Sequence, residues 1–146
     1  MRRFVNPGNT AFEVAVNSQI YVDKTGLLAY TNSVINTKQA LICSSRPRRF
    51  GKSITADMLC AYYSSGCDSD SIFASYEIAK SDSYKKYLNQ YDVIKINMQE
   101  FLSMSGTMEE MLEMLKKYLV LDFEETYPQV RFRDEKNLIQ VMKDVF

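Results

Sequence analysis

The feature that most constrains the fold is a loop ending in Gly51-Lys52-Ser53, which lies between two apolar patterns. The run at 38–43 predicts a buried strand, and the residues after the loop carry apolar side chains at helical spacing. A glycine lets a phosphate oxygen approach the backbone N–H, a lysine brings positive charge to the outer phosphates, and a serine hydroxyl can hold Mg²⁺. A helix that begins at the loop adds the partial positive charge of its N-terminus. The order strand, loop, helix therefore predicts a phosphate-binding loop.

The first half of the loop departs from the usual pattern, which has a glycine where this chain has Arg46. Pro47 can fix the turn instead, because its ring sets φ without needing a positive value. Arg48 and Arg49 can face a nucleotide, a nucleic-acid backbone or only water. An alternative therefore stays open, in which this segment is a basic surface turn between a strand and a helix.

Two segments together resemble the motifs of one family. Tyr21-Val22-Asp23-Lys24-Thr25 comes first, and the loop reads Arg46-Pro47-Arg48-Arg49-Phe50-Gly51-Lys52-Ser53. Both resemble, residue for residue, the YVDKT and RPRRFGKS motifs of the AAA-ATPase-like family of bacterial and archaeal proteins, in which the missing first glycine is normal. Loop chemistry and resemblance together predict binding of ATP with Mg²⁺. The expected nucleotide-binding residues are Arg48, Arg49, Phe50, Gly51, Lys52, Ser53 and Ile54, with Ser53 also as the metal ligand.

The same resemblance implies elements that these 146 residues do not contain. In the family, an apolar strand ending in an acidic pair, the Walker B element, lies downstream of a helix that residues 135–146 resemble. Full-length relatives often continue into a nuclease-like C-terminal domain of the PD-(D/E)XK type. We therefore expect residues 1–146 to be the N-terminal part of a single P-loop domain, truncated before Walker B. ATP hydrolysis is then expected to be absent, and nucleic acid would be bound through the missing C-terminal domain.

The pattern of the whole chain predicts an α/β fold. Predicted strands at 38–43 and 91–98 are separated by helical patterns, and such strands usually pair in parallel through right-handed crossovers. We expect a P-loop NTPase-like parallel sheet flanked by helices, incomplete because the Walker B strand is missing. The predicted helices begin near Asp23, at Lys52, after Gly106-Thr107 and after Asp134-Glu135.

Residues 118–122 form an apolar run that ends in Asp122, which is also what a Walker B strand looks like. As a strand, this run would supply a metal-holding acid within the chain. Apolar side chains from Met108 to Phe123 recur at helical spacing, however, and glutamates and lysines fill the opposite face. We therefore predict a continuous helix from 107 to about 126 and keep the strand as the alternative.

Composition excludes several classes of protein. The 18 basic and 18 acidic side chains cancel, so any attraction to phosphate must be local to the loop. The absence of histidine excludes a Ser-His or Cys-His nucleophile within the chain, and it leaves the three cysteines without a partner for a zinc site. Reduced thiols and the lack of a long apolar run predict a cytoplasmic protein that does not span a membrane.

More than one class of function remains open. The first is ATP–Mg²⁺ binding by the N-terminal part of an AAA-type ATPase. The second is a nucleic-acid or partner-protein module that uses the arginine-rich loop without nucleotide, and the third is a fragment with structure but no activity. Competition by ATP or by DNA oligomers at matched salt separates the first two. Apolar side chains at 138–146 further predict self-association.

Overall fold

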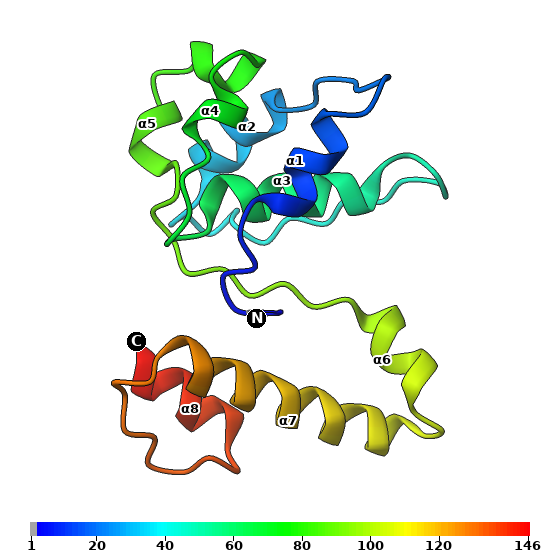
Figure 1. Cartoon of the computed structure of the whole chain (residues 1–146), viewed down its shortest axis with the longest axis vertical. Helices are drawn as coiled ribbons and strands as arrows, with labels where there is room; N and C mark the ends of the chain where they lie inside the picture. The colour runs from blue at the N-terminus through cyan, green and yellow to red at the C-terminus, as the bar shows by residue number, and fades with distance from the viewer. Residues whose placement is uncertain (1–2) are drawn as a thin grey trace. The chain divides into compact units, whose positions relative to one another are not determined.

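The computed structural model describes residues 3–146, which divide into two compact units. One unit combines residues 3–5 with Ile94–Phe146, and the other is Asn6–Val93. Figure 1 shows the helices of both units, each of which has its own core. The phosphate-loop motif lies entirely in the unit Asn6–Val93.

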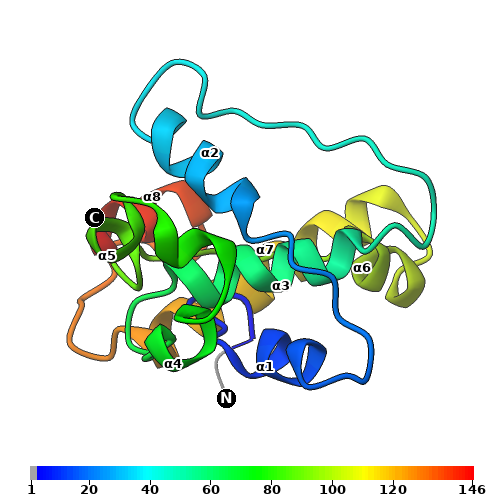
Figure 2. The ribbon, with the colours of Figure 1, turned by 90° about the horizontal axis from the view of Figure 1, so that it is seen from above.

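The unit Asn6–Val93 is a set of short helices around an aromatic core. Phe12, Tyr62 and Phe73 are fully buried, and the rings of Phe12 and Phe73 stack with centroids 5.1 Å apart. A long loop joins α2 to α3 (Figure 2). The helices are α1 (Thr10–Val16), α2 (Gly26–Val34), α3 (Lys52–Tyr63), α4 (Asp70–Phe73), α5 (Tyr84–Tyr87) and the 3₁₀ helix η1 (Glu77–Lys80).

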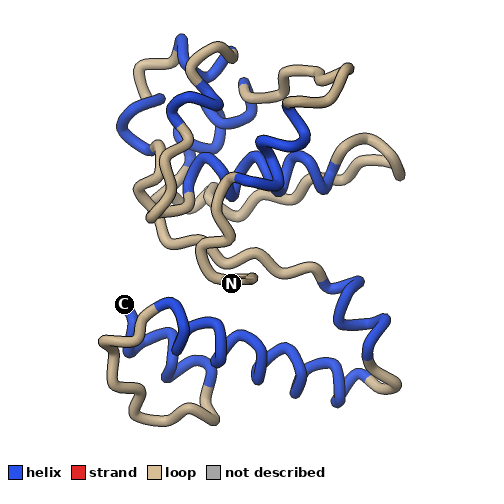
Figure 3. Tube along the Cα trace, viewed as in Figure 1, coloured by secondary structure: helices blue, strands red, loops and turns tan. Residues whose placement is uncertain are grey.

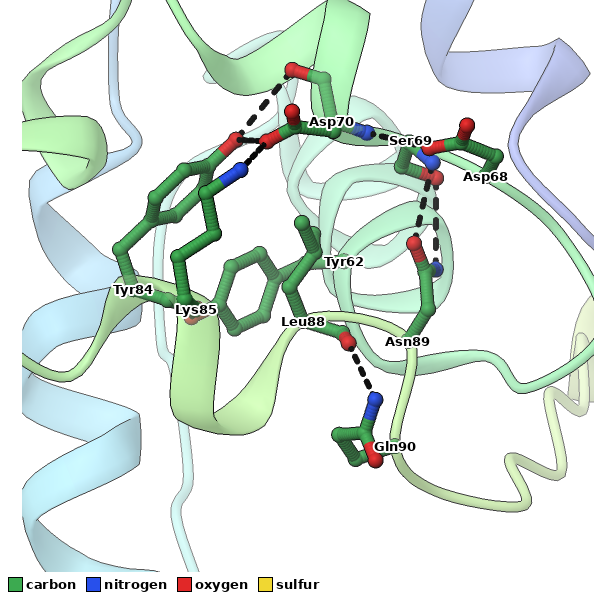
Figure 4. A network of polar contacts seen from close by, with 9 residues as sticks. All are labelled: Tyr62, Asp68, Ser69, Asp70, Tyr84, Lys85, Leu88, Asn89 and Gln90. Carbon is green, nitrogen blue, oxygen red and sulfur yellow. Dashed lines mark hydrogen bonds and ion pairs between the residues drawn. The ribbon is translucent and has the colours of Figure 1, made fainter.

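Polar contacts join the short helices of this unit to the C-terminal end of α3. The Tyr84 hydroxyl and the Lys85 ammonium both point at the Asp70 carboxylate (Figure 4), and the Tyr84 hydroxyl donates at 2.8 Å. Burial, and then the hydrogen bond to Asp70, raise the pKa of Tyr84, so its hydroxyl remains a donor. Ser69 donates from its hydroxyl to the Ala61 carbonyl of α3 and accepts from the Asn89 amide. These contacts hold α3 at the end opposite to the loop.

The other unit is built on one long helix. It contains α6 (Met98–Met104), α7 (Met108–Thr126) and α8 (Leu138–Val145), and α7 packs against both of the others. Thr107 and Glu110 form a capping box, in which each side chain accepts from the other residue's backbone N–H. Phe101, Met111 and Phe123 belong to its buried cores. No helix within residues 3–146 is both long and apolar enough to cross a membrane.

The predicted α/β fold with a parallel sheet is wrong. Figure 3 draws no strand in the described part of the chain, where the only β pairings are isolated bridges between Val5 and Ile94 and between Ser64 and Tyr91. The predicted strand at 38–43 is exposed along its whole length, and Leu41 is 96% exposed. A strand exists only when a neighbouring segment pairs with its backbone, and the described residues supply no such neighbour to 38–43 or, beyond single bridges, to 91–98. The two segments therefore do not pair with each other.

Candidate functional site

The loop at 46–53 turns sharply into α3. Gly51 precedes the first helical residue, Lys52, and has the left-handed conformation with φ 75° and ψ 29°. Arg49 also has a positive φ of 66°. The first turn of α3 is closed on the Gly51 carbonyl, which accepts from the backbone N–H of Thr55 at 2.9 Å and from its hydroxyl at 3.0 Å. The predicted start of a helix at Lys52 is therefore confirmed, and the glycine lies where a side chain would be strained.

Two lysine side chains lie on carbonyl groups of this loop. The Lys52 ammonium donates to the Arg46 carbonyl at 2.8 Å, and the Lys24 ammonium donates to the Phe50 carbonyl at 3.0 Å. A Cβ added to Gly51 would lie 3.1 Å from Nζ of Lys24. An ammonium has three donors, and the hydrogen bond to a neutral carbonyl uses one of them in each lysine, so both lysines have further donors for an anion.

The segment 21–25 holds Lys24 beside the loop. One carboxylate oxygen of Asp23 accepts from the Thr25 N–H at 2.8 Å, and the other accepts from the Glu77 N–H of η1 at 2.8 Å. Thr25 is fully buried, and its hydroxyl accepts from the Ile78 N–H at 3.1 Å. The residues on both sides of Lys24 are thus fixed to η1, while the Lys24 side chain reaches the loop.

Tyr21 fixes the other end of this segment. Its ring makes edge-on contacts with Phe12 and Tyr76, with centroids 5.9 and 5.4 Å apart. Burial, assisted by the charge of Asp23, raises the pKa of Tyr21 to about 12, so the hydroxyl stays neutral at physiological pH. The YVDKT motif therefore has a structural role that its match to the family did not explain.

Two cavities adjoin the loop. The first has a volume of about 330 Å³, and its lining is largely apolar. The second, of about 540 Å³, carries Arg46 and Lys52. Lys24, Phe50 and Thr55 line both. The apolar lining of the first cavity includes Ala15, Ile20, Tyr21, Val22, Ile54 and Met58.

The structure divides the expected site residues between these cavities. Arg49, Phe50, Gly51 and Ile54 line the first, and Phe50 and Lys52 line the second. Arg48 and Ser53 are exposed and line neither of the two. The expected set omitted Lys24 and the residues 20–22, although the adjacent YVDKT motif was the signal that could have identified them.

Asp122, the residue that a Walker B strand would have used, is a structural group. It lies in α7, is 5% exposed, and accepts hydrogen bonds from the backbone N–H groups of Arg3, Phe4 and Val5 at 3.1, 2.8 and 2.6 Å. The helical prediction for 118–122 is therefore confirmed. Within residues 3–146, no group of three or more histidine, cysteine or acidic side chains is placed to hold a metal ion.

Comparison with known proteins agrees with the resemblance of the two motifs. A family model described as AAA-ATPase-like, "Predicted AAA-ATPase", matches residues 8–146. Neither the curated proteins nor the solved structures gave a significant match. The family match covers nearly the whole chain, including the loop, both lysines and α7. This chain therefore belongs to the AAA-ATPase-like family of predicted AAA-ATPases.

Proposed function

We propose that the chain binds ATP together with Mg²⁺ at the loop 46–53. One observation carries this proposal. The ammonium groups of Lys24 and Lys52 both contact carbonyls of the loop that contains the left-handed Gly51, and two cavities lie beside this loop. A loop with these groups at a helix N-terminus is suited to a polyphosphate. Membership of a family of predicted ATPases makes a nucleoside triphosphate the natural ligand.

The two cavities could take the two parts of a nucleotide. Both linings are largely apolar, but three cations, Lys24, Arg46 and Lys52, line the second and two, Lys24 and Arg49, line the first. The first is within the size range of small-molecule sites, and around it Ile20, Val22 and Phe50 are 87, 66 and 57% exposed. A flat base would cover part of this apolar surface. The second cavity, with Arg46 and Lys52, has the charge that suits the phosphates, and the Lys52 ammonium would exchange the Arg46 carbonyl for a phosphate oxygen.

The residues present fit a magnesium ion that arrives with the nucleotide. Mg²⁺ prefers six oxygen ligands and usually keeps several waters, so one protein hydroxyl and the phosphate oxygens are enough to hold it. Ser53 is exposed in the first turn of α3 and could supply that hydroxyl. Because the buried carboxylate of Asp122 accepts from three backbone N–H groups of residues 3–5, it serves the packing of α7, and we propose binding without hydrolysis for this chain.

Displacement of a fluorescent ATP analogue tests this function. We expect ATP with Mg²⁺ to displace the analogue and DNA oligomers at the same ionic strength to fail. Lys52→Ala should weaken binding at least about tenfold, whereas Lys38→Ala, in the exposed segment before the loop, should leave it unchanged. Displacement by DNA but not by ATP would favour the nucleic-acid module instead and would refute the proposal.

A further inference from the structure

We propose that Lys24 is a second nucleotide-binding lysine, which contacts the phosphate attached to the ribose. This inference rests on the proposed function, because it assigns a role within the same site. Lys24 lies outside the phosphate-loop motif, 26 residues before the Phe50 carbonyl to which it donates. Its role therefore follows from the fold.

The position of Lys24 between the two cavities identifies the phosphate. Lys24, Phe50 and Thr55 line both cavities, whereas Arg49 lines only the first, and Arg46 and Lys52 line only the second. If the base of a nucleotide occupies the first cavity and its outer phosphates lie by Lys52, the part between them lies near the residues that line both cavities, of which Lys24 carries the only cation. Between its base and its outer phosphates a nucleotide carries the ribose and then the α-phosphate. Of these two groups only the α-phosphate, which AMP, ADP and ATP all carry, is an anion that an ammonium can pair with. Lys52 would instead act on the β- and γ-phosphates.

The surroundings of Lys24 leave its charge available. Both oxygens of the neighbouring Asp23 carboxylate accept from backbone N–H groups, of Thr25 and of Glu77. In the part of the chain that the structure describes, Lys24 takes part in no ion pair, and its ammonium lies on a neutral carbonyl. Exchanging that carbonyl for a phosphate oxygen replaces a neutral contact with a charged one, which is the stronger kind.

The backbone around Lys24 is fixed before any ligand binds. Asp23 and the buried Thr25 hold the segment to η1, so only the side chain of Lys24 has to move. A cation presented from a fixed backbone loses less entropy on binding than one on a mobile loop. Lys24 is thus placed in advance for an anion at the junction of the cavities.

A ligand series separates this contact from a purely structural role. Dissociation constants for adenosine, AMP, ADP and ATP would be measured by NMR titration of the wild-type chain and of Lys24→Met, Lys24→Arg, Lys52→Met and Lys38→Met. We expect Lys24→Met to weaken AMP, ADP and ATP by a similar factor of about ten and to leave adenosine unchanged. Lys24→Arg should keep most of the affinity, because it keeps the charge. Lys52→Met should weaken ADP and ATP but spare AMP, and Lys38→Met should bind all four ligands as the wild type does.

Other outcomes would overturn the inference. If Lys24→Met weakens adenosine as much as AMP, Lys24 only supports the pocket. If it weakens ATP but not AMP, Lys24 only positions the loop through Phe50. No change with any ligand would remove Lys24 from the site, while loss of ATP binding in Lys52→Met would still support the proposed function. A wild-type chain that binds none of the phosphorylated ligands would refute both proposals.

Discussion

Replacement of Asp122 by asparagine should destabilise the unit that contains α7 without changing nucleotide binding. Oδ2 of Asp122 accepts from the N–H groups of Phe4 and Val5, and Oδ1 accepts from the N–H of Arg3. Asparagine has almost the same shape but only one accepting oxygen. With that oxygen in place of Oδ2, its NH₂ group would face the N–H of Arg3, and the two donors would repel each other.

The size of the effect follows from these contacts. A hydrogen bond to a charged group contributes about 1.5–3 kcal/mol, and one to a neutral group contributes about 1 kcal/mol. Asp122→Asn loses one bond outright and turns the remaining two into neutral bonds. Asp122 is only 5% exposed, so water replaces the lost partner poorly. We therefore expect the free energy of unfolding to fall by about 3 kcal/mol.

Urea unfolding followed by far-ultraviolet circular dichroism measures this loss, because α7 is the longest helix of the described residues. Glu124→Gln, on the same helix, is the matched control and should change stability by less than about 0.5 kcal/mol. Lys52-dependent ATP hydrolysis that Asp122→Asn abolished at unchanged stability would refute this reasoning. Asp122 would then be the metal-holding acid of a Walker B element after all.

Further predictions concern the segment beside the loop and the exposed run before it. Thr25→Val should cost about 1–3 kcal/mol, measured by thermal unfolding, because it leaves the buried N–H of Ile78 without an acceptor. For Asp23, burial opposes the charged form, but the hydrogen bonds it accepts outweigh burial and lower its pKa. The charged Asp23 should therefore add to the free energy of unfolding above its ordinary pKa of about 4, and this contribution should be lost as the pH falls through the lower pKa of the folded state. On acidification, the wild type and Asp23→Asn should thus approach the same stability. Gly51→Ala should cost about 1–2 kcal/mol and weaken ATP binding in the same titrations, since φ is 75° there. The stripe at 138–146 packs largely into the core around Val141, so it does not explain self-association. We still expect self-association in sedimentation experiments, reduced by Leu41→Lys, because the whole segment 38–43 is exposed, with Leu41 at 96% and Ile42 at 47%.

The helices could be predicted where their signals are local. Gly106-Thr107 and the apolar stripe after them predicted α7, whose bounds are Met108–Thr126, and the capping box of Thr107 with Glu110 explains why the helix begins there. The last helix was placed too early, because its cap is Asn137, whose side chain accepts from the Gln140 N–H. The short helix α6 was missed, since seven residues carry too little periodicity to identify a helix.

The prediction of a parallel sheet was wrong because strand pairing is not a local property of the sequence. The run at 38–43 is apolar enough for a buried strand, yet its side chains are exposed. An apolar run indicates that a segment can be buried, but the segment forms a strand only when a partner segment pairs with it. Single bridges at Val5 and at Tyr91 are all that the described residues form in place of the expected sheet.

The candidate site could be predicted in part. Gly51 and Lys52 follow from their order in the loop, and the helix does begin at Lys52. The YVDKT motif marked the segment that contains Lys24, but only the fold shows that the Lys24 side chain reaches the loop, because its contact with the Phe50 carbonyl joins residues 26 positions apart. The hydrogen bonds that Asp23 and Thr25, on either side of Lys24, accept from backbone N–H groups of η1 likewise depend on where η1 lies in the fold.

Calorimetric titration of the chain with ATP and Mg²⁺ tests the central claim most directly. The account predicts one site per chain for the wild type and at least about tenfold weaker binding for Lys52→Ala at unchanged thermal stability. Absence of heat and of saturation with the wild type, or equal affinity in Lys52→Ala, would contradict nucleotide binding at this loop.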